Sequence, residues 1–220
     1  IRDDDPDLRG DRNYVDRILD AYADMRASTR DFIASHPSEA RLLFLALLSD
    51  VIFFVARAVS MVIIVPDEVA SALPEFVGVG IFLAFLLRTS LFYVCAALAH
   101  IISKPFGGKG TWYTTRCGVF WAAFVSVPIE VLGTLTTLIV VNLREDVSFL
   151  DHQWLVHTPY FVVPIAFGFF MSAGIAQAQG FKYNYKVMAV LAAFTLPLLL
   201  GLVYLVGKYS DVGPFAGVAG

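Results

Sequence analysis

The sequence predicts an all-α polytopic membrane protein in which a cytoplasmic amphipathic helix precedes five transmembrane helices. The first observation is composition: 58% of the 220 residues are hydrophobic and only 16% are charged, a balance outside the range of soluble domains. The second is that apolar residues gather in five stretches, each with the roughly 20 residues needed to cross about 30 Å of hydrocarbon. These stretches cover residues 42–65, 77–102, 117–141, 159–179 and 187–207.

The region before the first stretch is polar and is not a membrane span. Residues 1–41 contain seven Arg and ten Asp or Glu. From about Asp11 to Ala34, apolar side chains recur every three or four residues, which is the period of one helical face. This face includes Val15, Ile18, Tyr22 and Met25. It predicts an amphipathic helix that packs on the protein itself or at the membrane interface, with docking of a partner as the alternative.

Proline divides this region from the membrane domain. The predicted helix should end at His36-Pro37, because the residue before a proline is disfavoured in the helical conformation. We therefore assign residues 1–36 to a cytoplasmic, acidic and Arg-rich region. Residues 37–210 form the five-helix membrane domain, and residues 211–220 form a short external tail.

Loop charges predict the orientation of the chain in the membrane. The loop at 66–76 carries three acidic residues and no Lys or Arg, whereas the loop at 103–116 carries Lys104, Lys109 and Arg116 and no acid. Cytoplasmic loops are the ones enriched in Lys and Arg. We therefore expect the N-terminus on the cytoplasmic side of the membrane and the C-terminus on the outer side.

Four ionisable residues lie inside the apolar stretches: Asp50, Arg57, Arg88 and Glu130. Each costs roughly 2.5–3.5 kcal/mol at the bilayer centre and should therefore face the protein interior and find a partner. At 1.5 Å per residue, Arg57, Arg88 and Glu130 lie roughly 20–24 Å from the cytoplasmic ends of their spans. Asp50 lies roughly 13 Å from the end of its span. We expect Glu130 to pair with Arg88 and Asp50 with Arg57, as a structural clamp between spans. An ion or proton pathway is the alternative.

The fourth stretch carries small residues at every fourth position: Gly168, Ser172, Ala176 and Gly180. Such faces let helices approach closely in lipid. The spacing does not distinguish a contact within the chain from one in a homo-oligomer, and we favour the contact within the chain.

Catalytic and metal-binding patterns are not recognisable in the sequence. No Ser/His/Asp or Cys/His arrangement lies near one membrane face, and His152 and His157 lack further ligands at metal-site spacing. We expect no catalytic residue, metal or cofactor. A net charge of −3 gives no electrostatic reason to expect nucleic acid as a partner.

The loop between the second and third stretches contains Gly107, Gly108, Lys109 and Gly110. A phosphate-binding P-loop is excluded, because that motif needs an earlier glycine at fixed spacing and a preceding strand. The run Pro105-Phe-Gly-Gly-Lys-Gly-Thr-Trp-Tyr-Thr-Thr-Arg116, continuing to Pro128, resembles the central segment of bacterial members of the Yip1 family, as does Ile175-Ala-Gln-Ala-Gln-Gly-Phe181.

The resemblance covers residues 37–207 and implies a five-span, non-enzymatic protein of the bacterial inner membrane, in which the outer side is the periplasm. Eukaryotic relatives act in vesicle trafficking with small GTPases and with each other, so only architecture and a scaffolding role carry over to a bacterial chain. We expect a scaffold, assembly factor or accessory subunit that binds membrane lipids or another integral membrane protein. A small transporter or channel that uses the four intramembrane charges is the alternative.

Overall fold

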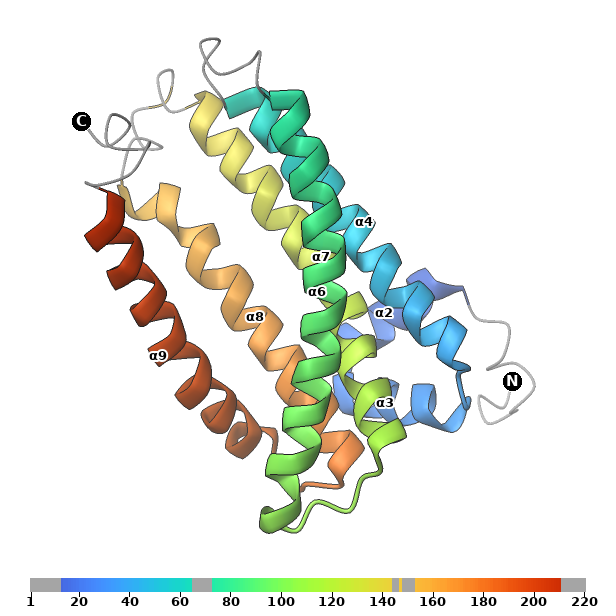
Figure 1. Ribbon diagram of the computed structural model, residues 1–220. Coiled ribbons are helices and arrows are strands. Elements are labelled where there is room, and N and C mark those ends of the chain that lie inside the picture. The colour runs from blue at the N-terminus through green and yellow to red at the C-terminus, as the bar shows by residue number, and fades with distance from the viewer. Residues whose placement is uncertain (1–12, 65–72, 144–146, 148–152, 211–220) are drawn as a thin grey trace.

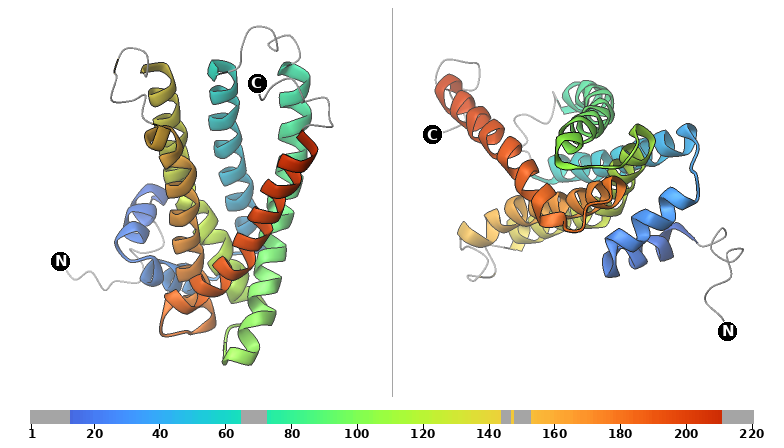
Figure 2. Two further views of the ribbon diagram at one scale, coloured as in Figure 1. Left: turned by 90° about the vertical axis from the view of Figure 1, so that its left-hand side faces the viewer. Right: turned by 90° about the horizontal axis from the view of Figure 1, so that it is seen from below.

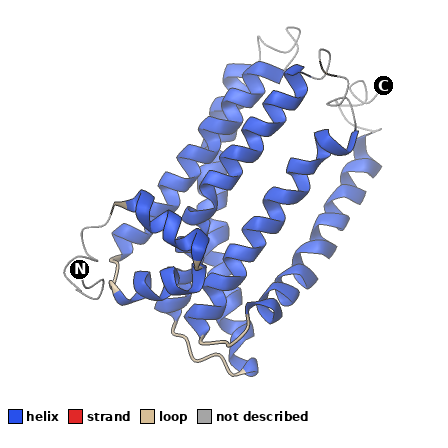
Figure 3. Cartoon of the chain, turned by 180° about the vertical axis from the view of Figure 1, so that it is seen from behind, coloured by secondary structure: helices blue, strands red, loops and turns tan. Residues whose placement is uncertain are grey.

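The computed structural model describes residues 13–64, 73–143, 147 and 153–210 (Figure 1). Within these ranges the chain forms helices and connecting turns and no strand (Figure 3). The helices are α2 (Tyr14–Ala23), α3 (Met25–Ala34), α4 (Glu39–Ile64), α6 (Leu73–Ser103), the short 3₁₀ helix η1 (Lys104–Phe106), α7 (Trp112–Leu143), α8 (Gln153–Gln179) and α9 (Asn184–Ser210).

Four helices are long and apolar enough to cross a membrane. Their qualifying segments are Glu39–Val59, Phe85–Phe106, Trp112–Leu143 and Val162–Gln179. They correspond to the first four predicted stretches. The fifth, 187–207, lies in α9, most of whose second half has side chains outside the described residues. The predicted external tail at 211–220 also lies outside the described residues.

Five long helices form a bundle that is tight at one end and splayed at the other (Figures 1 and 2). We call the tight end, where the turns at 104–111 and 180–183 lie, the lower end. Helix α7 is central: it contacts α4, α6 and α8, while α9 packs on α8. The lower end is the one that the loop charges predict to be cytoplasmic.

Burial changes abruptly along α7. Every residue from Cys117 to Val127 is buried, so this part of the helix is covered by protein on all sides. From 131 to 139, every residue is half-buried or exposed. The 32 residues of α7 extend over about 48 Å, which exceeds the roughly 30 Å of a hydrocarbon core. Its lower part is therefore a protein core, and its upper part has the exposure expected of a lipid-facing helix.

The single amphipathic helix predicted at about 11–34 is instead a hairpin of two helices. The chain becomes extended at Asp24, with φ −147° and ψ 93°. The Asp24 carboxylate accepts hydrogen bonds from the backbone N–H groups of Arg26 and Ala27, both at 3.0 Å. A side chain of this type caps the first turn of a new helix, and here it outweighs the apolar periodicity. The predicted break at His36-Pro37 is present: α3 ends at Ala34, and His36 has φ +45°.

The helical hairpin, α2 with α3, packs against the lower halves of α7 and α8 (Figures 1 and 2). Phe32 is fully buried and stacks on Trp121 of α7, with ring centroids 4.7 Å apart. The Trp121 indole N–H donates to Ser28 Oγ at 3.0 Å. The hairpin therefore shares one hydrophobic core with the bundle, rather than forming the separate region that the polar composition suggested.

Candidate functional site

The charges inside the bundle converge on Arg88 of α6. One terminal nitrogen of its guanidinium contacts both Glu130 oxygens, at 2.9 and 3.1 Å, and its Nε lies 3.0 Å from Asp50 Oδ1. Three helices, α4, α6 and α7, thus meet at one cation. We call Asp50, Arg88 and Glu130 the charge clamp. The predicted pairing of Arg88 with Glu130 is present.

The predicted pairing of Asp50 with Arg57 is wrong. Asp50 contacts Arg88 and accepts a hydrogen bond from Thr89 Oγ1 at 2.8 Å. Arg57 lies at an exposed position of α4, seven residues and therefore about 10 Å further along the helix. A spacing of seven puts two side chains on the same face, but it does not bring them into contact. Thr89 could not be selected from the sequence, because its contact with Asp50 depends on the packing of α4 against α6.

The charge clamp is dry and enclosed. The Asp50, Glu130 and Arg88 side chains are 0, 8 and 15% exposed. The Arg88 guanidinium carbon also lies 4.2 Å from the centre of the Phe53 ring, within the range of a cation–π contact. The hydrogen bonds from Arg88 to Glu130 are charge-assisted, which is the stronger class. The hydrogen bond between Thr89 and Asp50 adds α4 to this network.

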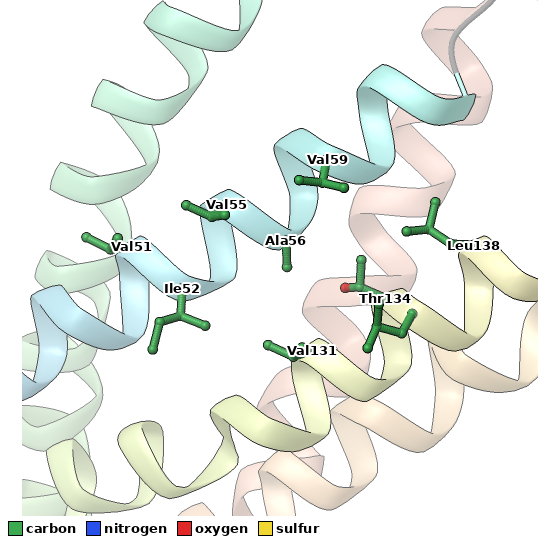
Figure 4. A pocket seen from close by; sticks show the side chains of 9 residues that line it. Val51, Ile52, Val55, Ala56, Val59, Val131, Thr134 and Leu138 are labelled. Carbon is green, nitrogen blue, oxygen red and sulfur yellow. The ribbon is translucent and has the colours of Figure 1, made fainter.

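An apolar groove runs between α4 and α7 on the upper side of the charge clamp (Figure 4). It is open and has a volume of about 340 Å³, and of its described lining residues all are apolar except Thr134. Side chains from both helices point into it, and neither Arg88 nor Glu130 lines it. The lining residues are Val51, Ile52, Val55, Ala56, Val59, Val131, Thr134, Leu135 and Leu138. We call this feature the α4–α7 groove.

The small-residue face of α8 is only partly a contact face. Ser172 and Ala176 are buried, but a Cβ placed on Gly168 or Gly180 would meet no atom within 4 Å. Gly180 instead ends α8 with φ +75°, and Phe181 N–H donates to Ala176 O at 2.8 Å, as in a Schellman motif.

A close approach of the α7 and α8 backbones occurs at a glycine pair that the four-residue spacing did not select. A Cβ on Gly118 would lie 2.6 Å from Gly174 O, and a Cβ on Gly174 would lie 2.6 Å from Gly118 O. No side chain fits between the two backbones at this crossing. Gly174 lies two residues from Ser172 and from Ala176, so it is off the predicted face.

The Gly-rich segment of the family motif is a packed turn at the lower end. Lys109 N–H donates to Gln179 O at 2.9 Å, and Gly110 N–H donates to Gln179 Oε1 at 3.2 Å. A Cβ at Gly108 would lie 2.7 Å from Gln179 Oε1. Gly107 has φ +84°, a conformation that favours glycine. The glycines therefore let this turn close on the end of α8.

Gln179, which belongs to the family-like run Ile175–Phe181, also connects α8 to α7. It is fully buried, and its amide nitrogen donates to Thr115 Oγ1 of α7 at 2.7 Å. Arg116 and Pro128 also have structural positions. Both terminal nitrogens of Arg116 donate to the Glu39 carboxylate at 2.6 Å, which fixes the start of α4 to the start of α7. Pro128 lies inside α7.

The predicted partner-facing residues of the hairpin point in different directions. Met25 is buried and Ile18 packs against the core, whereas Val15 is 59% exposed. Tyr22 is partly exposed, and its hydroxyl donates to Val125 O of α7 at 3.1 Å. Burial raises the pKa of the Tyr22 phenol, so this donor keeps its proton at neutral pH. Leu19, which the sequence analysis did not select, is 62% exposed.

Arg26 fastens the hairpin to the turn between α8 and α9. Its guanidinium donates to the carbonyl oxygens of Lys182 and Phe181, both at 2.5 Å, and to Gln177 Oε1 at 3.3 Å. Carbonyl groups at the end of a helix lack partners within it and accept such hydrogen bonds readily. An arginine in a polar region carries no sequence signal for this role.

Neither a metal cluster nor a related protein adds to this description. In the described part of the chain, no three His, Cys, Asp or Glu residues lie together as metal ligands. A scan of protein-family models, a search of curated proteins and a search of solved structures each find no match for this chain.

Proposed function

We propose that this chain is a non-enzymatic membrane scaffold or accessory subunit, of the Yip1 type that its sequence motifs resemble, which binds another integral membrane protein along the α4–α7 groove. The groove carries the proposal: it is open, apolar and lies between two helices that qualify as membrane spans. A surface of this kind accepts an apolar helix or an acyl chain, and among its described lining residues Thr134 alone has a polar side chain.

The geometry of the charge clamp supports this function over transport. Asp50 is fully buried, Glu130 nearly so, and both contact Arg88. A transport pathway needs a wet cavity that reaches its charged groups, whereas the α4–α7 groove is lined by apolar side chains and excludes the clamp. We therefore assign the clamp to holding α4 in position, so that the groove keeps its shape.

Filling the groove tests the proposal. Val55 lines the groove and is 57% exposed, so Val55→Trp should occupy the space while leaving the fold intact. Val94 of α6 is 51% exposed and does not line the groove, so Val94→Trp is the matched control. We expect about a tenfold loss of co-purifying partner with Val55→Trp, equivalent to about 1.4 kcal/mol, and no loss with Val94→Trp.

These two variants, together with Glu130→Gln, separate a scaffold from a transporter. Partner recovery should be measured from native membranes by quantitative mass spectrometry, and ion flux should be measured in proteoliposomes. Equal partner recovery from both variants contradicts a binding role for the groove. An ion flux that disappears when Glu130 is changed to Gln would replace the scaffold by the transporter.

A further inference from the structure

The charge clamp has one more acid than base. Asp50 and Glu130 contact the single guanidinium of Arg88, so the three groups carry a charge of −1 if all are ionised. An uncompensated buried charge is strongly destabilising, and two carboxylates that share a site resist ionising together. We propose that the clamp is a proton-binding site in which Asp50 holds a proton at neutral pH.

The contacts of the two carboxyl groups differ, and the difference assigns the proton. Glu130 receives Arg88 at both oxygens, at 2.9 and 3.1 Å, and Ser126 Oγ lies 3.4 Å from its Oε1. Hydrogen bonds to both oxygens stabilise the ionised form. Glu130 therefore remains the carboxylate that balances Arg88.

Asp50 lacks comparable support for a negative charge. It is fully buried, and although its Oδ1 lies 3.0 Å from Arg88 Nε, that N–H is not directed at it, so Oδ1 has no hydrogen-bond donor. Oδ2 has one hydroxyl partner, Thr89 Oγ1, at 2.8 Å. A hydroxyl can accept as well as donate. A proton on Asp50 Oδ2 is accordingly donated to Thr89, while Oδ1 stays a neutral carbonyl oxygen facing Arg88.

Among the residues that the structure describes, the other ionisable groups near Asp50 do not supply the missing positive charge. On α6 the cation is Arg88, which Glu130 of α7 already engages. On α4 itself, Arg57 is seven residues away at an exposed position. The proton comes from water, and its release leaves two carboxylates on one guanidinium. The site therefore makes the junction of α4 with α6 and α7 sensitive to pH, independently of what binds the α4–α7 groove.

Infrared spectroscopy tests this on the full chain in nanodiscs. A protonated carboxyl group has a C=O stretch separate from carboxylate bands, and ¹³C-labelled aspartate shifts it only if the group belongs to Asp. At neutral pH we expect a carboxylic acid band that shifts with labelled aspartate, is lost in Asp50→Asn and is retained in the control Asp31→Asn, since Asp31 is exposed. The chain without substitutions, labelled with ¹³C-aspartate, still shows whether the band shifts even if a variant fails to fold.

Three outcomes would overturn the proposal. Absence of the band means that both carboxyl groups are ionised. A shift with labelled glutamate moves the proton to Glu130. A melting temperature that rises with Na⁺, in a chain without the band, makes the clamp a sodium site instead.

Discussion

At the scale of single residues, Arg88 connects three helices. Its guanidinium contacts Asp50 of α4 and Glu130 of α7, and it lies over Phe53. Replacing a buried ion pair by apolar groups is often nearly neutral, whereas removing one partner is strongly destabilising. The clamp is therefore evidence for a specified arrangement of helices rather than for high stability.

This distinction gives a double-variant prediction. Arg88→Leu alone leaves the Glu130 carboxylate without its cation and should lower the free energy of unfolding by about 3–5 kcal/mol. Glu130→Gln alone should cost less, because Asp50 can then release its proton and balance the charge of Arg88. The combined Arg88→Leu, Glu130→Leu variant should recover most of the loss, because a protonated Asp50 is then the only member that remains. Unfolding in a mild detergent measures all three variants.

An exposed pair provides the control for the double variant. Arg30 and Asp31 lie 4.0 Å apart with mostly solvated side chains, so Arg30→Leu should change the free energy of unfolding by no more than about 0.5 kcal/mol. If the double variant were no more stable than the worse single variant, the pairing of Arg88 with Glu130 would not be the main interaction at this site.

At the scale of elements, the hairpin shows that one capping side chain can divide a regular apolar pattern into two helices. Apolar periodicity runs from 11 to 34, but Asp24 caps a second helix through Arg26 and Ala27. The two helices then place Met25 and Phe32 inside and leave Leu19 outside. Asp24 was the available sequence signal, since Asp is among the preferred N-cap residues.

Phe32 anchors the hairpin, and its removal should release the hairpin from the bundle. The side chain is fully buried against Trp121, and Phe→Ala changes in cores cost about 3–5 kcal/mol. Limited proteolysis should therefore cut Phe32→Ala within 13–36 much faster than the unaltered chain. Leu19→Ala, at a 62% exposed position of the same hairpin, should be cut at the original rate. Equal protection of both variants would show that the hydrogen bonds of Ser28, Tyr22 and Arg26 hold the hairpin without the stacked ring.

At the scale of the whole molecule, the sequence predicted composition-driven features and missed those that depend on tertiary contact. Four predicted spans are present as helices suited to a membrane, because apolar length is a property of the chain alone. The Gly118–Gly174 crossing and the role of Gln179 were not predicted. Both depend on how α7 meets α8, which spacing within one helix does not specify.

The charge cluster illustrates the same limit. Depth counting correctly placed Arg88 beside Glu130, since both lie at similar distances from the same end of neighbouring helices. The predicted pairing of Asp50 with Arg57 came from their seven-residue spacing, but two residues on the same face of a helix need not touch. In the structure, α6 supplies both Arg88 and Thr89 to Asp50, so the neighbouring helix determines the partner.

The arrangement of the bundle makes a prediction about the two sides of the membrane. Lys109 and Tyr183 lie in the turns at the lower end, and both side chains are exposed. Val147 is exposed beyond the upper end of α7. Single cysteines at Lys109 and Tyr183 should therefore react with a membrane-impermeant maleimide from one side, and a cysteine at Val147 from the other. Loop charges predict that the first side is the cytoplasm.

The labelling needs a background without the native cysteines, Cys95 and Cys117. Alanine rather than serine is suitable at Cys117, because that side chain is fully buried and a serine hydroxyl there would need a hydrogen-bond partner. Reaction from outside the cell should be at least tenfold faster at Val147 than at Lys109. Labelling of Lys109 and Val147 from the same side would mean that α7, whose 32 residues connect them, does not cross the membrane. The α4–α7 groove would then lose its lipid-facing setting, and with it the proposed binding of a membrane partner.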